Sequence, residues 1–108
     1  MKTTSHYNDI FCRRLKQARL ASGLSQKRLG VAAGIDEFVA STRINRYEKG
    51  VHEPAIEIVR KLAEVLCVPL AYFYAEDDDL AELMLIFLSL SSRQREALLD
   101  YVKHRLVG

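Results

Sequence analysis

The chain of 108 residues is predicted to fold as an all-α protein, and three observations support this prediction. Apolar side chains recur every three to four residues along most of the chain, which is the spacing of one helix face. No run of residues alternates between apolar and polar types, as a half-buried strand would. Glycine, serine and proline stand between the periodic segments, where helices end and begin. This length supports one compact domain with a short appended element.

The first helix is predicted over residues 8–22, with basic residues between its apolar positions. Gly23 ends this helix, because glycine adopts the left-handed C-terminal conformation without strain. Ser25 is the expected N-cap of a second helix over residues 26–33, since its hydroxyl can accept from a free backbone N–H group. Gly34 then ends the second helix.

Two prolines introduce the next helical segments. Pro54 marks the entry to a fourth helix, and Pro69 opens a short helical turn rich in aromatic residues. The apolar stripe of the fourth helix consists of Ile56, Val59, Leu62, Ala63 and Leu66. The short turn carries Leu70, Tyr72, Phe73 and Tyr74.

The segment after residue 75 is predicted to be helical as well. Residues 76–79 form an acidic run that suits a solvated turn and the positive start of a helix. The run lacks the interleaved spacing and the glycine of a calcium loop, so no metal site is expected. Ser91 and Gln94 form a capping box for a last helix that reaches about Leu106.

The charge is unevenly distributed, although the net charge is only +2. Residues 1–53 carry ten Lys and Arg against five Asp and Glu, a net charge of +5. Residues 54–108 carry six basic and nine acidic residues, a net charge of −3. A basic half that faces phosphate and an acidic half that faces away favour oriented docking on a nucleic acid.

Several function classes are not expected. The sequence has no Ser-His-Asp arrangement, HExxH motif or phosphate-cradling glycine loop, so we expect no enzyme activity and no cofactor. The start of the chain is polar, and the longest apolar stretches are too short to span a membrane. Cys12 and Cys67 lie far apart without a CxxC motif, which favours a cytoplasmic location.

Several motifs occur in a fixed order along the chain. They are Arg-Leu-Lys-x-x-Arg at residues 14–19, Gly-Leu-Ser-Gln at residues 23–26, Gly34, Tyr47-Glu48-x-Gly50, Pro54, Leu62-Ala63, and Val68-Pro69 before Tyr72-Phe73. With these motifs, residues 10–74 resemble the Cro and phage-repressor-like helix-turn-helix regulators, often called the Xre type. The resemblance implies a lambda-repressor-like DNA-binding domain of five helices over residues 1–75. One or two additional C-terminal helices would follow over residues 76–108.

The resemblance further implies that the third helix enters the major groove of double-stranded DNA. It also implies a structural clamp, in which Arg19 of the first helix pairs with Glu48 at the end of the third. Breaking a buried pair of this kind from one side leaves an uncompensated charge. We therefore expect the clamp to hold the reading helix in place.

Two single residues depart from the family pattern. Gly30 stands where alanine is usual and costs the helix about 0.5–1 kcal/mol, for which close backbone packing is the expected reason. Cys67 replaces the glycine that usually follows the fourth helix. We expect Cys67 to be a small buried hydrophobe, with a redox sensor as the alternative.

Four residues more than usual separate the turn glycine from the apolar anchor Ile44 of the third helix. Asp36 could cap a helix that starts one turn early, since four residues are close to one turn. Alternatively, residues 35–40 could form a longer turn, with Ser41 capping a short helix over residues 42–49.

Of these two structures we favour the longer turn. An early helix would carry Asp36 and Glu37 to the groove, where their carboxylates would face phosphates. It would also point Phe38 or Val39 at DNA or solvent, whereas a loop can fold Phe38 back onto the body.

The outer face of the third helix holds the candidate base-reading residues. Ile44 and Tyr47 must face the core, which leaves the other positions for DNA. Arginine can make a bidentate contact with guanine, and asparagine with adenine. We expect base reading from Thr42, Arg43, Asn45 and Arg46.

Phosphate contacts are expected mainly around the start of the second helix. Gln26 resembles the glutamine that, in this family, contacts the sugar-phosphate backbone and braces the reading helix. Contacts of this kind fix register and affinity and carry no sequence choice. The further phosphate candidates are Ser25, Lys27, Lys49 and His52.

The last two helices carry more apolar surface than one short helix can hide, which suggests a protein contact. Operators read by such motifs are commonly two half-sites about 34 Å apart, which calls for a two-fold dimer. We therefore expect a homodimeric transcriptional repressor, with a monomer whose tail completes its own core as the alternative. The alternative function is an antitoxin-type or adaptor protein that binds a protein partner through these helices. The expected dimerisation residues are Leu83, Phe87, Leu98, Leu99, Val102 and Leu106.

Overall fold

The computed structural model describes residues 6–107, and all regular structure within this range is helical. In chain order, the elements are α1 (His6–Ala21), α2 (Gln26–Ala32), α3 (Ala40–Glu48), α4 (Ile56–Leu66), the 3₁₀ helix η1 (Leu70–Tyr74), α5 (Asp78–Ser89), α6 (Ser92–Tyr101) and the π-helical segment η2 (Val102–Val107). The prediction of an all-α fold is confirmed. None of the helices between residues 6 and 107 combines the length and the apolar character needed to cross a lipid bilayer.

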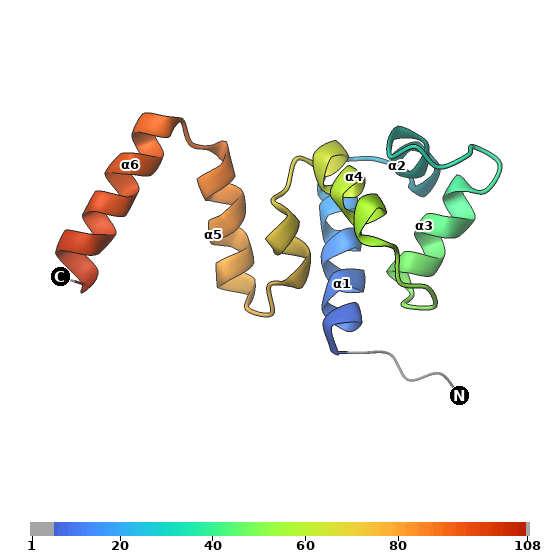
Figure 1. Cartoon of the computed structure of the whole chain (residues 1–108), viewed down its shortest axis with the longest axis horizontal. Coiled ribbons are helices and arrows are strands. Elements are labelled where there is room, and N and C mark those ends of the chain that lie inside the picture. The colour runs from blue at the N-terminus through green and yellow to red at the C-terminus, as the bar shows by residue number, and fades with distance from the viewer. Residues whose placement is uncertain (1–5, 108) are drawn as a thin grey trace.

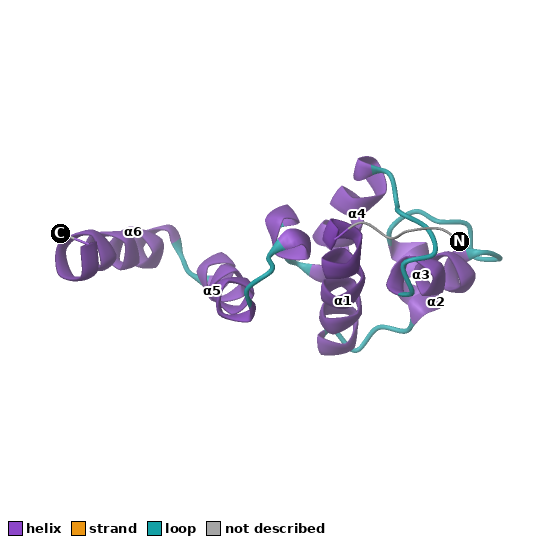
Figure 2. Ribbon diagram, turned by 90° about the horizontal axis from the view of Figure 1, so that it is seen from below, coloured by secondary structure: helices purple, strands orange, loops and turns teal. Residues whose placement is uncertain are grey.

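Helices α1 to α4 and η1 gather around one apolar core, while α5 and α6 extend from it to one side (Figure 1). The molecule measures 51 × 30 × 21 Å, because α5 meets the core only through Ala81 and Met84 and α6 continues away from it (Figure 2). The largest fully buried side chains are Phe11, Leu15, Leu29, Ile44, Val59, Leu62 and Phe73. These residues come from five different elements and hold the helical body together.

The helix ends follow the local features that predicted them. Gly23 and Gly34 adopt φ values of +71° and +91°, which glycine tolerates after a helix. The hydroxyl of Ser25 accepts a backbone N–H group of α2 at 3.0 Å. Ser91 and Gln94 form the predicted capping box at the start of α6.

The additional residues before α3 lie in a longer turn, as the favoured alternative predicted, but α3 begins at Ala40, two residues before the predicted start at Thr42. Two further details of that prediction are wrong. Val39 occupies the N-cap position in place of Ser41, and no side chain caps the helix. Phe38 does not fold back onto the body, since it is 88% exposed. The physical reason is that Ala40, fully buried against α2, already occupies the space at the start of α3.

The expectation that Cys67 is a small buried hydrophobe is also wrong. Cys67 ends α4 in the left-handed conformation, with φ 55° and ψ 46°, although it is not a glycine. Because the chain turns away from α4 at this residue, the side chain lies outside the core and is exposed.

A buried arginine joins the core to the start of α5. Arg14, whose side chain is only 3% exposed, donates to the carbonyl of Ala75 at 2.9 and 2.7 Å and pairs with Asp78 at 3.0 Å. Its guanidinium group also lies over the ring of Tyr72, 5.8 Å from the centroid. Sequence analysis included Arg14 only as the first residue of a family motif and assigned it no contact, although its position falls on the buried face of α1. These contacts set the point at which the C-terminal helices leave the body.

Close packing explains the glycine inside α2, as expected. A Cβ atom at position 30 would lie 2.8 Å from the Cβ of Ala40, closer than two such atoms can approach. Gly30 therefore allows the start of α3 to rest directly on the backbone of α2.

We predict that Gly30→Ala lowers the free energy of unfolding by about 1–3 kcal/mol, the usual range for overpacking. The higher helix propensity of alanine would by itself raise the free energy of unfolding by about 1 kcal/mol. Overpacking and helix propensity therefore predict opposite signs for the change. Chemical denaturation measures the change, and Val31→Ala is the control because Val31 is exposed on the same helix. A gain in stability for Gly30→Ala would contradict the close packing of α2 on α3.

Candidate nucleic-acid interface

Helices α2 and α3 pack closely against each other as a helix-turn-helix pair. One face of α3 is buried, since Ala40, Ile44 and Tyr47 are at most 3% exposed. Their spacing of four and three residues places them on one side of the helix. The exposed residues of α3 and its C-cap include Thr42, Arg43, Arg46 and Lys49. The pair therefore presents a polar and basic helix face outward.

Arg19 and Glu48 form a nearly buried bidentate ion pair, which is the pair that the family resemblance implies. Nε of Arg19 lies 2.6 Å from Oε2 of Glu48, and Nη2 lies 3.2 Å from Oε1. The two side chains are only 11% and 4% exposed. Arg19 also donates to the carbonyl of Leu24 at 3.0 Å, in the connection between α1 and α2. One guanidinium group thus ties the end of α3 to α1 and to the approach to α2.

Gln26 joins this network from the first position of α2. Its Nε2 donates to Oδ1 of Asn45 and to Oε1 of Glu48, at 3.2 Å each. Gln26 was predicted to contact phosphate and to brace the reading helix, and Asn45 to read bases. The structure brings these two side chains together, half-buried, beside the Arg19–Glu48 pair. Through these hydrogen bonds, Gln26 connects α2 directly to α3.

Arg43 is held in place by a residue that sequence analysis assigned only to the core. Its Nη2 donates to the hydroxyl of Tyr47 at 3.0 Å, and its guanidinium carbon lies 6.0 Å from the ring centroid. The four-residue spacing of the two residues on one helix was the sequence feature that could have shown this contact. A guanidinium group has five N–H donors, and this contact uses only one of them.

The other predicted phosphate contacts lie at the two ends of the pair. Ser25 and Lys27 stand at the start of α2, whereas Lys49 and His52 follow α3. All four are exposed. The hydroxyl of Ser25 already serves as the N-cap of α2, so its lone pairs are partly used.

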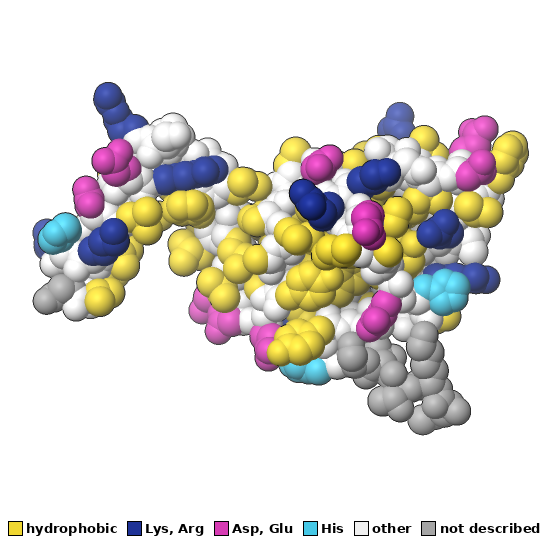
Figure 3. Space-filling model, in the orientation of Figure 1, with side chains coloured by type: hydrophobic (Ala, Val, Ile, Leu, Met, Phe, Trp, Pro, Cys, Tyr) yellow, Lys and Arg dark blue, Asp and Glu magenta, His cyan; other side chains and the backbone are white. Residues whose placement is uncertain are grey.

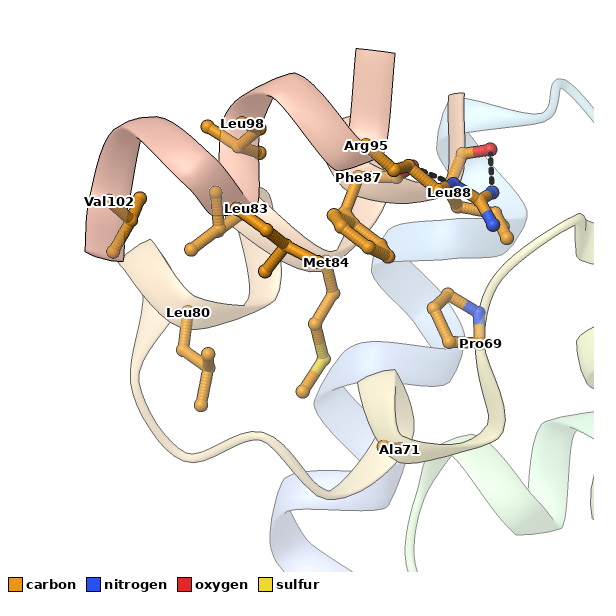
Figure 4. A pocket seen from close by; sticks show the side chains of 11 residues that line it. Pro69, Ala71, Leu80, Leu83, Met84, Phe87, Leu88, Arg95, Leu98 and Val102 are labelled. Atoms are coloured by element: carbon orange, nitrogen blue, oxygen red, sulfur yellow. Dashed lines mark hydrogen bonds between the residues drawn. The ribbon is translucent and has the colours of Figure 1, made fainter. Parts of the chain in front are cut away.

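The C-terminal helices present a second, apolar surface. Helix α6 has no buried residue, and a groove of about 560 Å³ lies between α6, α5 and η1 (Figure 4). In Figure 3, apolar side chains gather where α5 and α6 face each other. Of the predicted dimerisation residues, the groove is lined by Leu83, Phe87, Leu98, Leu99 and Val102. Leu106 lies outside the groove lining and is 69% exposed.

Arg95, which sequence analysis missed, fastens the start of α6 to the end of α5. It donates to the carbonyls of Phe87 at 3.0 Å and Leu88 at 2.9 Å. Its guanidinium carbon also lies 5.0 Å from the centroid of the Phe87 ring. Because carbonyl groups at a helix end have no partner within their helix, an arginine one turn into the next helix is well placed to bind them.

The chain belongs to the helix-turn-helix family, whose sequence model matches residues 15–73, more than half of the chain. It is similar to the crystal structure of the transcriptional regulator BswR, with 44% sequence identity and a TM-score of 0.84 over 89% of this chain and 95% of that chain. It is also similar in fold to a SinR protein/SinI protein complex, with 24% identity and a TM-score of 0.62 over 91% of this chain and 99% of that chain. A comparison with curated proteins found no match.

The predicted resemblance to helix-turn-helix regulators is therefore confirmed. Family membership and the likeness to a transcriptional regulator together support a DNA-binding regulator.

We predict that Arg19→Met lowers the free energy of unfolding by about 3–5 kcal/mol, because Glu48 would be left buried without a counter-charge. Arg13→Met is the matched control, since Arg13 is 47% exposed and pairs with the 74% exposed Asp78. That change should cost less than about 1 kcal/mol. Urea unfolding at one protein concentration compares the two, and equal losses would contradict a structural clamp.

Proposed function

We propose that the protein is a transcriptional repressor that binds a specific two-half-site operator in double-stranded DNA as a homodimer. The observation that carries the proposal is the outer face of α3. This face is exposed and basic, whereas the inner face is buried and the C-terminal end is held by Glu48. A rigid helix that presents such side chains suits the major groove, where base edges display distinct hydrogen-bonding patterns.

Base reading is assigned to four residues of α3. Arg43 and Arg46 suit guanine, because a guanidinium group can donate to O6 and N7 together. The contact with Tyr47 restrains Arg43 before DNA binds, which reduces the entropy lost on binding. Asn45 suits adenine and is oriented by Gln26, and Thr42 suits a thymine methyl group or a phosphate.

Phosphate contacts are assigned to the residues that flank α3. Gln26, Ser25 and Lys27 lie on one side of the reading helix in the sequence, and Lys49 and His52 on the other. Basic residues predominate in residues 1–53 and acidic residues in the remainder. This imbalance favours approach of the helix-turn-helix body to DNA and keeps the C-terminal helices away from it.

Dimerisation is assigned to α5 and α6. A helix of ten residues without a buried side chain is marginal in water, so α6 needs a partner surface. A second copy of the chain would supply matching apolar residues, and a two-fold dimer matches an operator with two half-sites. We propose repression as the outcome, because a small dimer that occupies promoter DNA can block transcription without any further domain.

A heterologous protein partner is the second candidate for the groove. The likeness in fold to the SinR protein/SinI protein complex favours it, because that structure contains two different proteins. In that case, a helix of the partner would cover the apolar residues of α5 and α6.

Selection from random duplexes at fixed salt should enrich one motif, and its affinity can be followed by fluorescence anisotropy. Arg43→Ala and Arg46→Ala should each weaken binding to this motif by about 1–3 kcal/mol. Arg60→Ala is the matched control, because Arg60 is an exposed arginine of α4. Equal losses in all three variants, or no enriched motif, would contradict base reading by α3.

Sedimentation velocity of the full chain tests the dimer. Leu99→Glu places a charge in the apolar groove and should give a monomer, because a lone carboxylate is costly to bury. Ile86→Glu is the matched control, since Ile86 is 49% exposed, close to the 47% of Leu99, and does not line the groove. A monomeric wild-type protein, or identical behaviour of the two variants, would contradict the proposed interface.

A further inference from the structure

The turn between α2 and α3 presents an aromatic ring that the proposed function has not used. Phe38 is 88% exposed, the highest value among the large apolar residues that the structure describes. A single exposed apolar residue is ordinary on a protein surface. Phe38 differs from such residues because it lies in the turn of the helix-turn-helix pair, directly before the proposed reading helix.

The backbone around Phe38 is held by local hydrogen bonds. Oδ1 of Asp36 accepts the N–H group of Phe38 at 2.8 Å, and the N–H group of Val39 donates to the carbonyl of Asp36 at 3.1 Å. Ile35 and Ala40, which bound the turn, are 6% and 0% exposed. The turn is therefore anchored at its two ends, and the ring is directed away from the body.

The turn lies beside the end of α3 that enters DNA in proteins of this fold. The first residues of a recognition helix contact the base edges. Phe38 stands two residues before α3 begins and four residues before Thr42. In Figure 1 this turn forms the edge of the molecule most distant from α6. If α3 enters the major groove as proposed, an exposed ring two residues before its start lies close to the same groove.

Charge indicates which part of the DNA the turn can face. Asp36 and Glu37 precede Phe38 and are exposed, and carboxylates are repelled by phosphates. A turn of this composition is unsuited to binding the sugar-phosphate backbone. The apolar ring can instead contact the C5-methyl group of thymine, which is the apolar feature of the major groove.

We propose that Phe38 is a specificity-determining residue that packs against one thymine methyl group in each half-site. This inference rests on the proposed DNA-binding function and adds a contact outside α3. The ring recognises the methyl group by shape and apolar contact, without a hydrogen bond. Phe38 thereby extends the sequence that one half-site specifies beyond the bases that α3 reaches.

Deoxyuridine tests the proposal, because it differs from thymidine only in lacking the methyl group. Each thymidine of the selected duplex is replaced in turn, and binding is measured for the wild-type protein and for Phe38→Ala at the same salt. One position in each half-site should lose affinity about fourfold with the wild-type protein, the value of one buried methyl-sized group. Phe38→Ala should show no loss at that position and the same losses as the wild type elsewhere.

The controls separate this proposal from the proposed function. Circular dichroism establishes that Phe38→Ala is folded, as expected for an exposed residue, and Glu37→Gln should keep the wild-type response to every deoxyuridine. If Phe38→Ala and the wild type respond alike at all positions, Phe38 reads no methyl group and its exposure serves a protein contact or nothing. If the wild-type protein prefers no duplex, the proposed function itself fails.

Discussion

The contact between Arg19 and Glu48 determines how the reading helix is presented. Removing two charges from water is unfavourable unless their geometry and hydrogen bonds compensate, and here the pair is bidentate. The carboxylate of Glu48 also accepts from Gln26, so one group joins α1, α2 and α3. At the opposite end of α3, Ala40 rests on the backbone of Gly30. A helix fixed at its two ends can expose its remaining face without bending or rotating.

Two arginines bind the segments that connect the two surfaces of the molecule. Arg14 binds the carbonyl of Ala75 and the carboxylate of Asp78, and so orients the start of α5 relative to α1. Arg95 then sets the angle between α5 and α6. If the C-terminal helices pair two copies, these contacts decide how far apart the two reading helices lie. The spacing of the half-sites would then depend on Arg14, which is buried, and on Arg95, which is half-buried, and not on the interface alone.

Features that depend on neighbouring residues could be predicted from the sequence, whereas features that depend on distant ones could not, apart from the Arg19–Glu48 pair, which the family resemblance implied. Ser25 caps a backbone group three residues away, so its role can be inferred from the adjacent sequence. Arg14 and its partner Ala75 are 61 residues apart, and nothing near Arg14 indicates that contact. The exposure of Phe38 and Cys67 was mispredicted for the same reason. It depends on how the chain fits the body, and in the case of Phe38 on Ala40, which already fills the available space.

The candidate site shows the same division. The outward positions of α3 followed from the buried anchors Ile44 and Tyr47, which is a rule of helix geometry. The contact of Gln26 with Asn45 depends on the angle between two helices, which periodicity does not encode. If the outer face of α3 lies along the base edges, backbone amide NMR spectra recorded during titration with a selected duplex should show it. We predict the largest shift changes at residues 38–49 and around Gln26, with small changes in α5 and α6. Changes confined to α5 and α6, with α3 unaffected, would contradict recognition by this helix.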